Sequence, residues 1–509
     1  MTLRGYDADA VRAAEAPALA AGRPLMRWAA LEVAAAVRGE LAAARIRSRS
    51  ARVLVLAGGG NNGGDGLHAA ADLAGRGMAV TALLARDQVH PVALERARRA
   101  HVHLLPVSTE DQLAAPGWRA AARQAHVWVD ALAGIGIRGG LRGQTAALVS
   151  ALTELRQECT VRVVAVDTPS GIDAGTGRLD GPLLAADRTV TMGAAKAALL
   201  LPPAALQAGT LQVAPLGLEA DFGAQPAAVT RLEPADVAAD WPVPRLSDHK
   251  YTRGVLGVVA GSPNYPGAGV LTTGAATATG CGMVRYLGAA EVAGRVLDHF
   301  PEVVTAAGRV QALVIGPGIA GEEQVAGLAG AVTAAIEHAP HDQPPAVVWD
   351  AGAFGLLPDR QDLLRATRSV LTPHAGELAA LLTAYGEQVD RPAVEAEPAA
   401  WAVRAAEITE SVVLVKGPVT VIAQPDGAVF SQADGSPWLA TAGSGDVLAG
   451  VLGALAATSS APLGRVAAAA ALVHGRAAQM AGDGGPFGAH HLLDAIAPTI
   501  TDLLPCPQR

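Results

Sequence analysis

The sequence predicts an α/β protein of two domains, each a mostly parallel β-sheet with helices on both faces. Short apolar runs typical of buried strands, such as residues 52–57, 79–84 and 161–166, alternate with helical patterns along the chain. Several of these runs end in glycine, aspartate or serine, and the carboxyl ends of strands in an open α/β sheet converge on the ligand crevice. The chain has 509 residues, which is too long for one typical core. We therefore expect two domains, each with a ligand site at one sheet edge.

Composition and charge narrow the class of protein. Half of the residues are hydrophobic (50%), 17% are charged and the net charge is −8. This predicts a globular chain, and the lack of a basic cluster predicts no nucleic-acid partner. Cys159, Cys281 and Cys506 lie far apart without a C-x-x-C motif, which predicts reduced thiols and neither zinc nor disulfides. With no signal peptide and no apolar run that could span a bilayer, we expect a cytoplasmic protein without a membrane partner. Alanine-rich helices lead us to expect a homo-oligomer, although no heptad identifies the interface.

A glycine-rich stretch follows the first predicted strand. We expect a helix over residues 9–44, a strand over 52–57, a loop over 58–66, a helix resuming at Leu67 and a strand over 79–84. Gly58, Gly60 and Gly63 satisfy the dinucleotide fingerprint, but that match alone is weak. Asn61, Asn62 and Asp65 add side-chain oxygens that suit a hydroxylated ligand or an oxygen-coordinated cation. The alternative is that these polar residues only form turns.

Two later strands end in polar residues at the same predicted edge. Residues 126–130 end in Asp130 and are followed by the glycine-rich segment 134–140. Residues 161–166 are followed by Asp167, Thr168, Pro169 and Ser170. We expect Asn62, Asp130, Asp167 and Ser170 to meet at the crevice. The alternative for any one carboxylate is a helix cap.

These segments resemble a known enzyme family. GGGNNGGDG at 58–66, VDALAGIG at 129–136, DTPSGID at 167–173 and TVTMGAAKA at 189–197 are similar to the NAD(P)H-hydrate epimerase domain. The resemblance covers most of residues 1–220 and implies a Rossmann-like fold. In that family the substrate is NADH or NADPH that has added water across the nicotinamide 5,6 double bond, and the enzyme interconverts the R and S hydrates at C6.

The resemblance also implies site residues. The hydrate would be bound by two segments, Asn61, Asn62, Gly63, Gly64, Asp65 and Gly134, Ile135, Gly136, Ile137, Arg138, Gly139, Gly140. A potassium ion would be held by Asn62, Asp130 and Ser170. Asp167 would contact the nicotinamide end and, with Lys196, transfer protons; the alternative for Lys196 is a solvated surface lysine. Arg27 and Ala30 stand where the family more often has Glu and Gly.

The boundary between the halves is expected after a closing strand. Residues 209–215 are typical of that strand, and residues 218–244 then mix Pro, Asp and Ala without periodicity. We place the boundary near Phe222 and Gly223, which gives domains of residues 1–222 and 223–509. The two halves are not repeats of each other.

The second half contains a further glycine-rich stretch, TAGSGDVLAG at 441–450. Exposed amides at a glycine-rich helix start form a ready anion site. Asp446 would lie beside a bound phosphate and could accept a proton from a substrate hydroxyl. The alternative is a tight loop capped by Asp446. His374 could simply cap a helix beginning at Glu377, whereas Lys416 at the end of an apolar strand would be costly to bury unpaired.

TPHAGE at 372–377, VKGPVT at 415–420 and TAGSGD at 441–446 resemble the ADP/ATP-dependent NAD(P)H-hydrate dehydratase domain. That domain is similar to the ribokinase-type fold, and the resemblance runs from about Asp248 to Met480. Both halves together match the bifunctional NAD(P)H-hydrate repair enzymes, with the epimerase first. In this family a nucleotide phosphorylates the C6 hydroxyl of the S hydrate, and phosphate then leaves to restore NADH or NADPH.

By this resemblance, Gly443, Ser444 and Gly445 would form the anion hole and Asp446 would deprotonate the hydroxyl. The nucleotide, ADP or ATP, would be bound by Lys416, Gly417, Pro418, Val419, Thr420 and Gly445, and the hydrate by Ala268, Gly318, His374 and Asp446. A magnesium ion is expected from the chemistry, although no carboxylate cage identifies its ligands. The sequence departs from the family pattern at Ala320, at Asp350-Ala351-Gly352 and at Ser436-Pro437-Trp438.

Two other functions remain open on the sequence. One is a ribokinase-type small-molecule kinase fused to a nucleotide-binding domain, which would release a stable phosphorylated product. The other makes the N-terminal half a non-catalytic binding or scaffold module.

Overall fold

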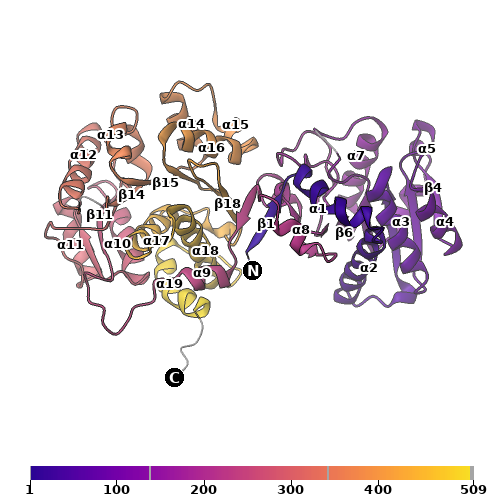
Figure 1. Cartoon of the computed structure of the whole chain (residues 1–509), viewed down its shortest axis with the longest axis horizontal. Coiled ribbons are helices and arrows are strands. Elements are labelled where there is room, and N and C mark those ends of the chain that lie inside the picture. The colour runs from indigo at the N-terminus through magenta and orange to yellow at the C-terminus, as the bar shows by residue number, and fades with distance from the viewer. Residues whose placement is uncertain (1, 137–138, 341–342, 505–509) are drawn as a thin grey trace. The chain divides into compact units, whose positions relative to one another are not determined.

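The computed structural model describes residues 2–136, 139–340 and 343–504. The chain divides into two compact units, one of Arg4–Val229 and one of Thr230–Arg509 together with Met1–Leu3 (Figure 1). The chain therefore passes from the first unit to the second between Val229 and Thr230. The predicted domain limits, 1–222 and 223–509, stay a prediction. In the part of the chain that is described, no helix is both long and apolar enough to cross a membrane. Cys159 and Cys281 are free thiols, and Cys506 lies outside the described residues.

The first unit is built on a parallel sheet of strand order β4-β3-β2-β5-β6-β7-β9. Its strands are β2 (Arg52–Ala57), β3 (Ala79–Leu84), β4 (His103–Pro106), β5 (Val127–Ala131), β6 (Arg162–Val166), β7 (Arg188–Met192) and β9 (Thr210–Ala214). A short pair, β1 (Leu3–Tyr6) and β8 (Ala195–Lys196), is also parallel. The predicted strands at 52–57 and 79–84 are confirmed.

Helices cover both faces of this sheet because successive strand residues point to opposite sides. Val53, Val55 and Ala57 share a buried cluster with α2 (Leu25–Ala43), α3 (Gly60–Ala74) and α4 (Pro91–Arg99). Leu54 and Leu56 share the opposite cluster with α6 (Gly117–Gln124) and α7 (Gly143–Glu158), and α5 (Glu110–Ala114) lies on that side. Helices α1 (Ala8–Ala20) and α8 (Glu219–Gly223) pack on each other, and short 3-10 turns occupy Ser48–Ser50, Ala197–Leu199 and Ala204–Gln207.

Two predictions for the first unit are wrong. The single helix expected over 9–44 is two helices, because Gly22 adopts a φ of 69° and Pro24 follows it. The loop expected over 58–66 is instead the start of α3 at Gly60. Glycine is a weak helix former, but here the helix approaches its neighbours too closely for a side chain. A Cβ atom on Gly63 would lie 2.0 Å from the Gly58 carbonyl oxygen, and one on Gly66 would lie 2.5 Å from the Ala131 Cβ.

The second unit is built on strands ordered β12-β11-β13-β14-β15-β16-β17-β18-β10. Neighbours from β12 to β16 are parallel, and β17 pairs antiparallel with both β16 and β18. The strands are β10 (Val229–Arg231), β11 (Val255–Val259), β12 (Met283–Tyr286), β13 (Ala312–Ile315), β14 (Ala346–Trp349), β15 (Arg368–Leu371), β16 (Val412–Val415), β17 (Thr420–Ala423) and β18 (Val429–Gln432).

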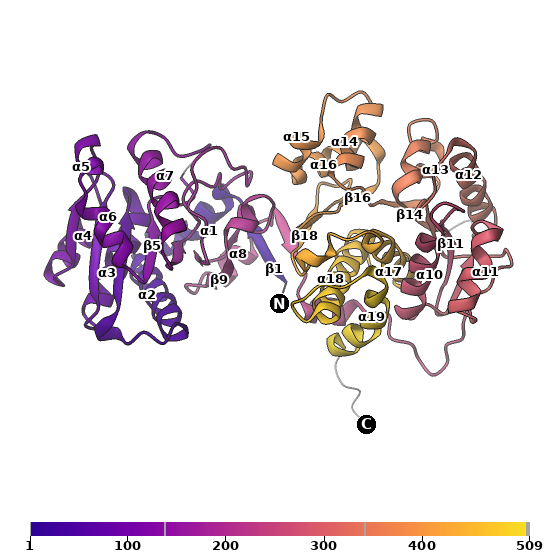
Figure 2. The ribbon, with the colours of Figure 1, turned by 180° about the vertical axis from the view of Figure 1, so that it is seen from behind.

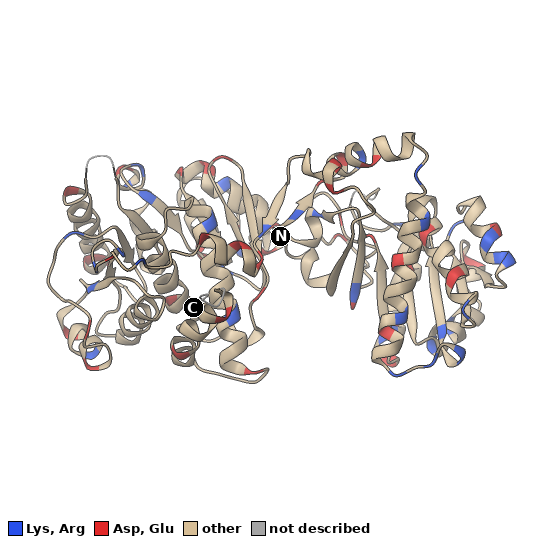
Figure 3. Cartoon of the chain, turned by 60° about the horizontal axis from the view of Figure 1, so that its bottom comes forward, with Lys and Arg blue, Asp and Glu red and all other residues tan. Residues whose placement is uncertain are grey.

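Alanine-rich helices form the main core of this unit. Helices α10 (Pro266–Ala278), α17 (Ser444–Thr458), α18 (Leu463–Gly482) and α19 (Ala489–Leu503) pack together with one face of the sheet, and Figure 2 shows them side by side. The other helices are α9 (Pro234–Asp240), α11 (Ala290–His299), α12 (Glu322–Glu337), α13 (Gln361–Arg365), α14 (Ala375–Ala384), α15 (Arg391–Ala396) and α16 (Pro398–Thr409), with 3-10 turns at Ala351–Leu356 and Pro437–Leu439. Within both units, acidic and basic residues are interspersed along the helices (Figure 3). The prediction of an α/β chain with two mostly parallel sheets is confirmed.

Candidate active sites

The predicted hydrate segment 61–65 forms the first turns of α3 at the carboxyl end of β2. Free amides at a helix start favour an anion there. The Asp65 side chain is buried, and burial together with the nearby charge of Asp167 raises its pKa well above the usual range. Within the described residues, Asn62 Nδ2 and Asp65 Oδ1 are buried without a hydrogen-bond partner. The polar atoms of this segment are thus available to a ligand.

Asp130 and Ser170 meet at the ends of β5 and β6. The Ser170 hydroxyl donates to Asp130 Oδ1 over 2.6 Å, and the Ser170 amide donates to Oδ2 over 2.7 Å. Asp130 is fully buried, and burial raises its pKa to about 6 against the opposing effect of the Ser170 hydrogen bonds. No lysine, arginine or histidine in the described ranges forms an ion pair with this carboxylate. A buried carboxylate of this kind lacks a counter-ion.

Asp167 and Lys196 form a buried ion pair. Lys196 is 1% exposed, so the alternative that it is a solvated surface lysine is wrong. Its Nζ contacts Asp167 Oδ1 and donates to the Met192 carbonyl oxygen over 2.7 Å. Asp167 Oδ1 also accepts the Met192 amide over 3.1 Å and the Thr191 hydroxyl over 3.4 Å. Asp167 adopts a φ of 68°, which is uncommon outside glycine and typical of functional sites.

The residues of the second predicted hydrate segment, 134–140, do not all lie at the same site. A Cβ atom on Gly134 would lie 3.4 Å from Asn62 Cγ and 3.5 Å from Asp167 Oδ2, so Gly134 joins the site. The Gly139 amide instead donates to Asp173 over 2.7 Å. Gly140 abuts the Asp180 carbonyl, and Ile135 packs against the cluster of α1 and α8. Gly136 has open space beside its Cα. Ile137 and Arg138 lie outside the described residues.

Glu15, in α1, is a further residue of this site that no sequence motif identifies. Burial raises the pKa of Glu15, the charge of Lys196 lowers it and the charge of Asp167 raises it again. Its electrostatic coupling to both residues places it near the Asp167–Lys196 pair. Only the packing of α1 creates this proximity, because no local motif surrounds Glu15.

In the second unit, Lys416 lies among carboxylates. Its Nζ is 2.9 Å from Asp350 Oδ1 and 3.6 Å from Glu377 Oε2, and the Thr372 hydroxyl donates to the same Asp350 oxygen over 2.8 Å. Burial acts to lower the pKa of Lys416, but the neighbouring carboxylates outweigh it and raise the pKa. Lys416 therefore carries its positive charge at the site. No local motif places Asp350 beside Lys416.

The anion loop lies at the start of α17, beside this lysine. Gly443 adopts a φ of 88°, and the Ser444 hydroxyl donates to the Leu439 and Thr441 carbonyl oxygens over 2.8 and 3.1 Å. A Cβ atom on Gly445 would lie 3.6 Å from Lys416 Nζ. The lysine charge therefore lies beside the start of α17, which suits a nucleotide phosphate.

Asp446 lies in the first turn of α17 and is partly exposed. Burial, followed by the charge of Asp350, raises its pKa to about 6, whereas Lys416 acts to lower it. Beneath the loop, His474 is buried against the Ser444 backbone, and burial lowers the pKa of His474 to about 4. His474 is a further residue of this site that no local motif identifies.

The other predicted residues of this site fall into three groups. Ala268 and Gly318 are in contact, since a Cβ atom on Gly318 would lie 2.5 Å from the Ala268 Cβ. His374 caps a helix, which was the alternative to a role in binding the hydrate. The helix begins at Ala375 and not at Glu377, and His374 Nδ1 accepts the Glu377 amide over 3.1 Å. Directly after Lys416, the turn into β17 contains Gly417, Pro418 and Val419, and Thr420 is the first residue of β17.

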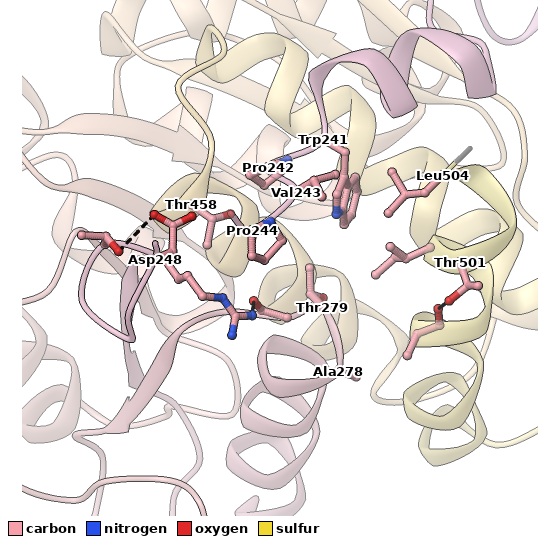
Figure 4. Close-up of a pocket in the computed structure, with 15 residues that line it drawn as sticks. Trp241, Pro242, Val243, Pro244, Asp248, Ala278, Thr279, Thr458, Thr501 and Leu504 are labelled. Carbon is pink, nitrogen blue, oxygen red and sulfur yellow. Dashed lines mark hydrogen bonds between the residues drawn. The ribbon is translucent and has the colours of Figure 1, made fainter. Parts of the chain in front are cut away.

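A separate cavity of about 400 Å³ lies in the second unit, and Figure 4 shows its lining. Ala278 and Thr458, the last residues of α10 and α17, line it together with Trp241 and Arg253. Because Asp446 lies in the first turn of α17 and Thr458 ends the helix, this cavity lies at the opposite end of the helix from the anion loop. It contains none of the predicted site residues.

Known proteins agree with this division of the chain. Residues 22–198 match the family described as YjeF-related protein N-terminus, and residues 256–498 match the family described as NAD(P)H-hydrate dehydratase. The chain is 42% identical over 474 residues to the bifunctional NAD(P)H-hydrate repair enzyme Nnr of Mycobacterium tuberculosis, with 91% of each chain covered. This chain belongs to the bifunctional NAD(P)H-hydrate repair enzyme family. The same enzyme of Mycobacterium leprae is 41% identical over 494 residues, which cover 94% of this chain and 95% of that one.

A solved structure and a shorter relative each match one half of the repair-enzyme chain. The NAD(P)H-hydrate epimerase of Microbacterium testaceum is 44% identical over 216 residues, 42% of this chain and 78% of that one. The ADP/ATP-dependent NAD(P)H-hydrate dehydratase of Bacillus subtilis, co-crystallised with ATP/Mg2+, is 26% identical with a TM-score of 0.47, covering 54% of this chain and 98% of that one. The predicted family, and with it an enzyme that combines an isomerase and a lyase domain, is confirmed. The roles of individual residues stay predictions.

Proposed function

We propose that this chain repairs hydrated NADH and NADPH at two sites, one in each unit. The first unit interconverts the R and S hydrates at C6, and the second dehydrates the S hydrate at the expense of ADP or ATP. One observation carries this proposal. In a chain of this family, each unit holds a lysine ion-paired with a buried aspartate near the carboxyl ends of its strands. The cytoplasmic location and the homo-oligomeric state remain predictions.

The Asp167–Lys196 pair suits epimerisation. C6 of the hydrate carries the hydroxyl group and is bonded to ring N1. When Asp167 takes the hydroxyl proton and Lys196 gives a proton to N1, the C6–N1 bond breaks and C6 becomes an aldehyde carbon. Return of N1 to the other face of the aldehyde, with both protons returned, yields the opposite epimer. The net charge of the buried pair stays constant throughout, which favours the step in a site with little water.

A potassium ion fits the neighbouring oxygen atoms of the first unit. Asp130 is a buried carboxylate without a cationic partner in the described ranges, and Ser170 supplies a hydroxyl oxygen beside it. Asn62, beside Gly134, adds an amide oxygen. A monovalent cation prefers such oxygen donors and would supply the missing charge. Bound there, it would contribute electrostatic stabilisation and fix the 130–134 segment against β6.

Asp446 suits phosphorylation of the C6 hydroxyl. Asp446 takes the hydroxyl proton, the C6 oxygen bonds to the terminal phosphorus of the nucleotide, and the bond from that phosphorus to its bridging oxygen breaks. The C6–O bond then breaks, its electron pair leaves with the phosphate, and the proton lost from C5 goes to that phosphate, so that the 5,6 double bond returns. A pKa of about 6 leaves Asp446 ionised at neutral pH while keeping it basic.

Residues beside the anion loop would bind the nucleotide and a magnesium ion. Lys416 lies beside Gly445 at the start of α17, a position that suits the phosphates. The described residues contain no cluster of three or more acidic, histidine or cysteine side chains that could hold a metal. Magnesium needs only one or two carboxylates besides the phosphates and water, and Glu377 and Asp350 fit that role. It would supply charge neutralisation for the phosphates.

The experiment is conversion of a mixed R and S hydrate, followed by the absorbance of reduced nicotinamide, with ADP or ATP, magnesium and potassium. We expect both epimers to be converted by the wild-type chain. Asp167→Asn should leave only the S fraction reactive on the same timescale, and Asp446→Asn should abolish recovery. A stable phosphorylated product would establish the kinase alternative instead. Unchanged conversion of the R hydrate by a folded Asp167→Asn variant would establish the scaffold alternative.

A further inference from the structure

The sheet of the first unit has the strand order of a dinucleotide-binding fold. Counted from β2, the order β4-β3-β2-β5-β6-β7 is third, second, first, fourth, fifth and sixth. In such sheets the dinucleotide lies across the carboxyl edge, with its pyrophosphate near the glycine stretch after the first strand. A residue after the second strand contacts the adenosine ribose, with an acid for the 2′-hydroxyl or an arginine for a 2′-phosphate.

The groups proposed to act on the nicotinamide lie on one side of β2. Asp130 lies at the carboxyl end of β5, Asp167 follows β6, and Lys196 lies in β8, the next strand after β7 along the chain. All three therefore lie on the side of β2 that holds the fourth to sixth strands. With the nicotinamide end there, the adenosine end lies over β3. That strand ends at Leu84 and is followed by Ala85, Arg86 and Asp87.

Arg86 is placed to meet this end of the substrate. A Cβ atom on Gly59, the residue that precedes α3, would lie 3.8 Å from Arg86 Cγ. The Arg86 side chain is exposed, and it makes no ion pair or hydrogen bond with any residue in the described ranges. The neighbouring acid is occupied, because Asp87 Oδ1 accepts the Ser108 hydroxyl over 2.5 Å. A free guanidinium and an occupied carboxylate favour a phosphate over a hydroxyl at this position.

We propose that Arg86 binds the 2′-phosphate of NADPH hydrate and makes the first unit select NADPH hydrate over NADH hydrate. This inference rests on the proposed epimerase function and specifies its substrate. Because Arg86 lies on the far side of β2 from Asp167 and Lys196, it acts on substrate binding and not on the proton transfers.

The test is the epimerisation of both R hydrates by the full chain. In Arg86→Ala, kcat/KM for NADPH hydrate should fall about ten- to a hundredfold through KM, as expected for the loss of hydrogen bonds to a charged group. The kcat for NADPH hydrate and both constants for NADH hydrate should stay within about twofold. Arg76→Ala is the matched control, because Arg76 is likewise exposed but follows α3 at the other end of that helix. Arg76→Ala should leave kcat/KM for both hydrates unchanged.

A second readout uses inhibition of epimerisation by two adenosine fragments. Adenosine 2′,5′-bisphosphate should inhibit the wild type more strongly than adenosine 5′-monophosphate, and Arg86→Ala should remove that difference. An equal fall in kcat/KM for both hydrates in Arg86→Ala would show that Arg86 contacts the pyrophosphate. An unchanged kcat/KM for both would show that Arg86 contacts neither the pyrophosphate nor the 2′-phosphate. Each of these results overturns the proposal. Failure of the wild type to epimerise either hydrate would instead overturn the proposed function, which keeps the two conclusions separate.

Discussion

Each unit pairs a lysine with an aspartate near the carboxyl ends of its strands, but the two pairs differ in burial and in what surrounds them. The Lys196 side chain is 1% exposed, and its partner Asp167 is itself a proposed proton-transfer group. The Lys416 side chain is 21% exposed and pairs with Asp350, while the proposed base is a different residue, Asp446. The Asp446 carboxylate makes no hydrogen bond or ion pair within the described ranges.

Because of this difference, the proposed catalytic charges also stabilise the fold in the first unit, whereas in the second unit the charge of Asp446 does not. In the first unit, neutralising one partner leaves the other as an uncompensated buried charge, which is strongly unfavourable. In the second unit, neutralising Asp446 removes a charge that burial and Asp350 already disfavour. Loss of a catalytic charge should therefore destabilise the first unit and stabilise the second.

The largest expected effect is on dehydration. Asp446→Asn removes the proposed base, and the dehydration rate should fall by about a hundred- to ten-thousandfold. Epimerisation should be unchanged, because Asp167 and Lys196 are untouched. The measurement is recovery of reduced nicotinamide from pure S hydrate with ADP or ATP. Asp359→Asn, a change at an exposed aspartate of the same unit, is the control. Retained dehydration in Asp446→Asn would show that another group takes the proton.

The next effect is on the stability of the first unit. Lys196→Met should lower its free energy of unfolding by about 3–5 kcal/mol, because Asp167 then remains buried and unpaired. Adding Asp167→Asn should restore part of that loss while epimerisation stays absent. Urea titration with hydrogen exchange of peptides from residues 4–229 measures this unit separately from the other. A Lys196→Met chain as stable as the wild type would contradict a closed ion pair.

Sequence reasoning succeeded where function is encoded locally. Asp130 and Ser170 each lie at or just after the end of an apolar run, and a parallel sheet brings such ends to one edge, so their contact could be predicted. The prediction of a loop over 58–66 is wrong because the glycines serve the close packing of α3, which outweighs their weak helix propensity. The packing of Gly66 against Ala131 depends on a strand far along the chain.

The missed site residues share a different cause. Asp350 reaches Lys416 from 66 residues away, and only the pairing of β14, β15 and β16 makes them neighbours. Glu15 and His474 come from helices whose docking a single sequence does not specify. Contacts that depend on how a helix docks or on the order of strands in the sheet therefore could not be predicted from local sequence patterns.

A smaller effect is the pH dependence of stability in the second unit. The folded pKa of Asp446 is about 6, above the ordinary value of 3.8, so the folded state binds this proton more tightly than the unfolded state. Folding is therefore penalised as pH rises through that interval, and the penalty is complete above about pH 6. Asp446→Asn should match the wild type below about pH 4 and exceed its unfolding free energy by roughly 1–3 kcal/mol above about pH 6. A constant difference at all pH values would contradict this assignment.

The smallest effect compares the hydroxyl groups that support the two aspartates. Thr372 donates to Asp350 over 2.8 Å, whereas Thr191 lies 3.4 Å from Asp167. Thr→Val keeps the shape and removes the hydroxyl group, so Thr372→Val should cost about 1–2 kcal/mol of unfolding free energy. Thr191→Val should cost less, about 0.5 kcal/mol, because its hydrogen bond is long and the Met192 amide and Lys196 still hold Asp167. Urea titration of each unit measures both changes. If Thr191→Val cost as much as Thr372→Val, Asp167 would depend on that hydroxyl group, and the ion pair with Lys196 would not be its main support.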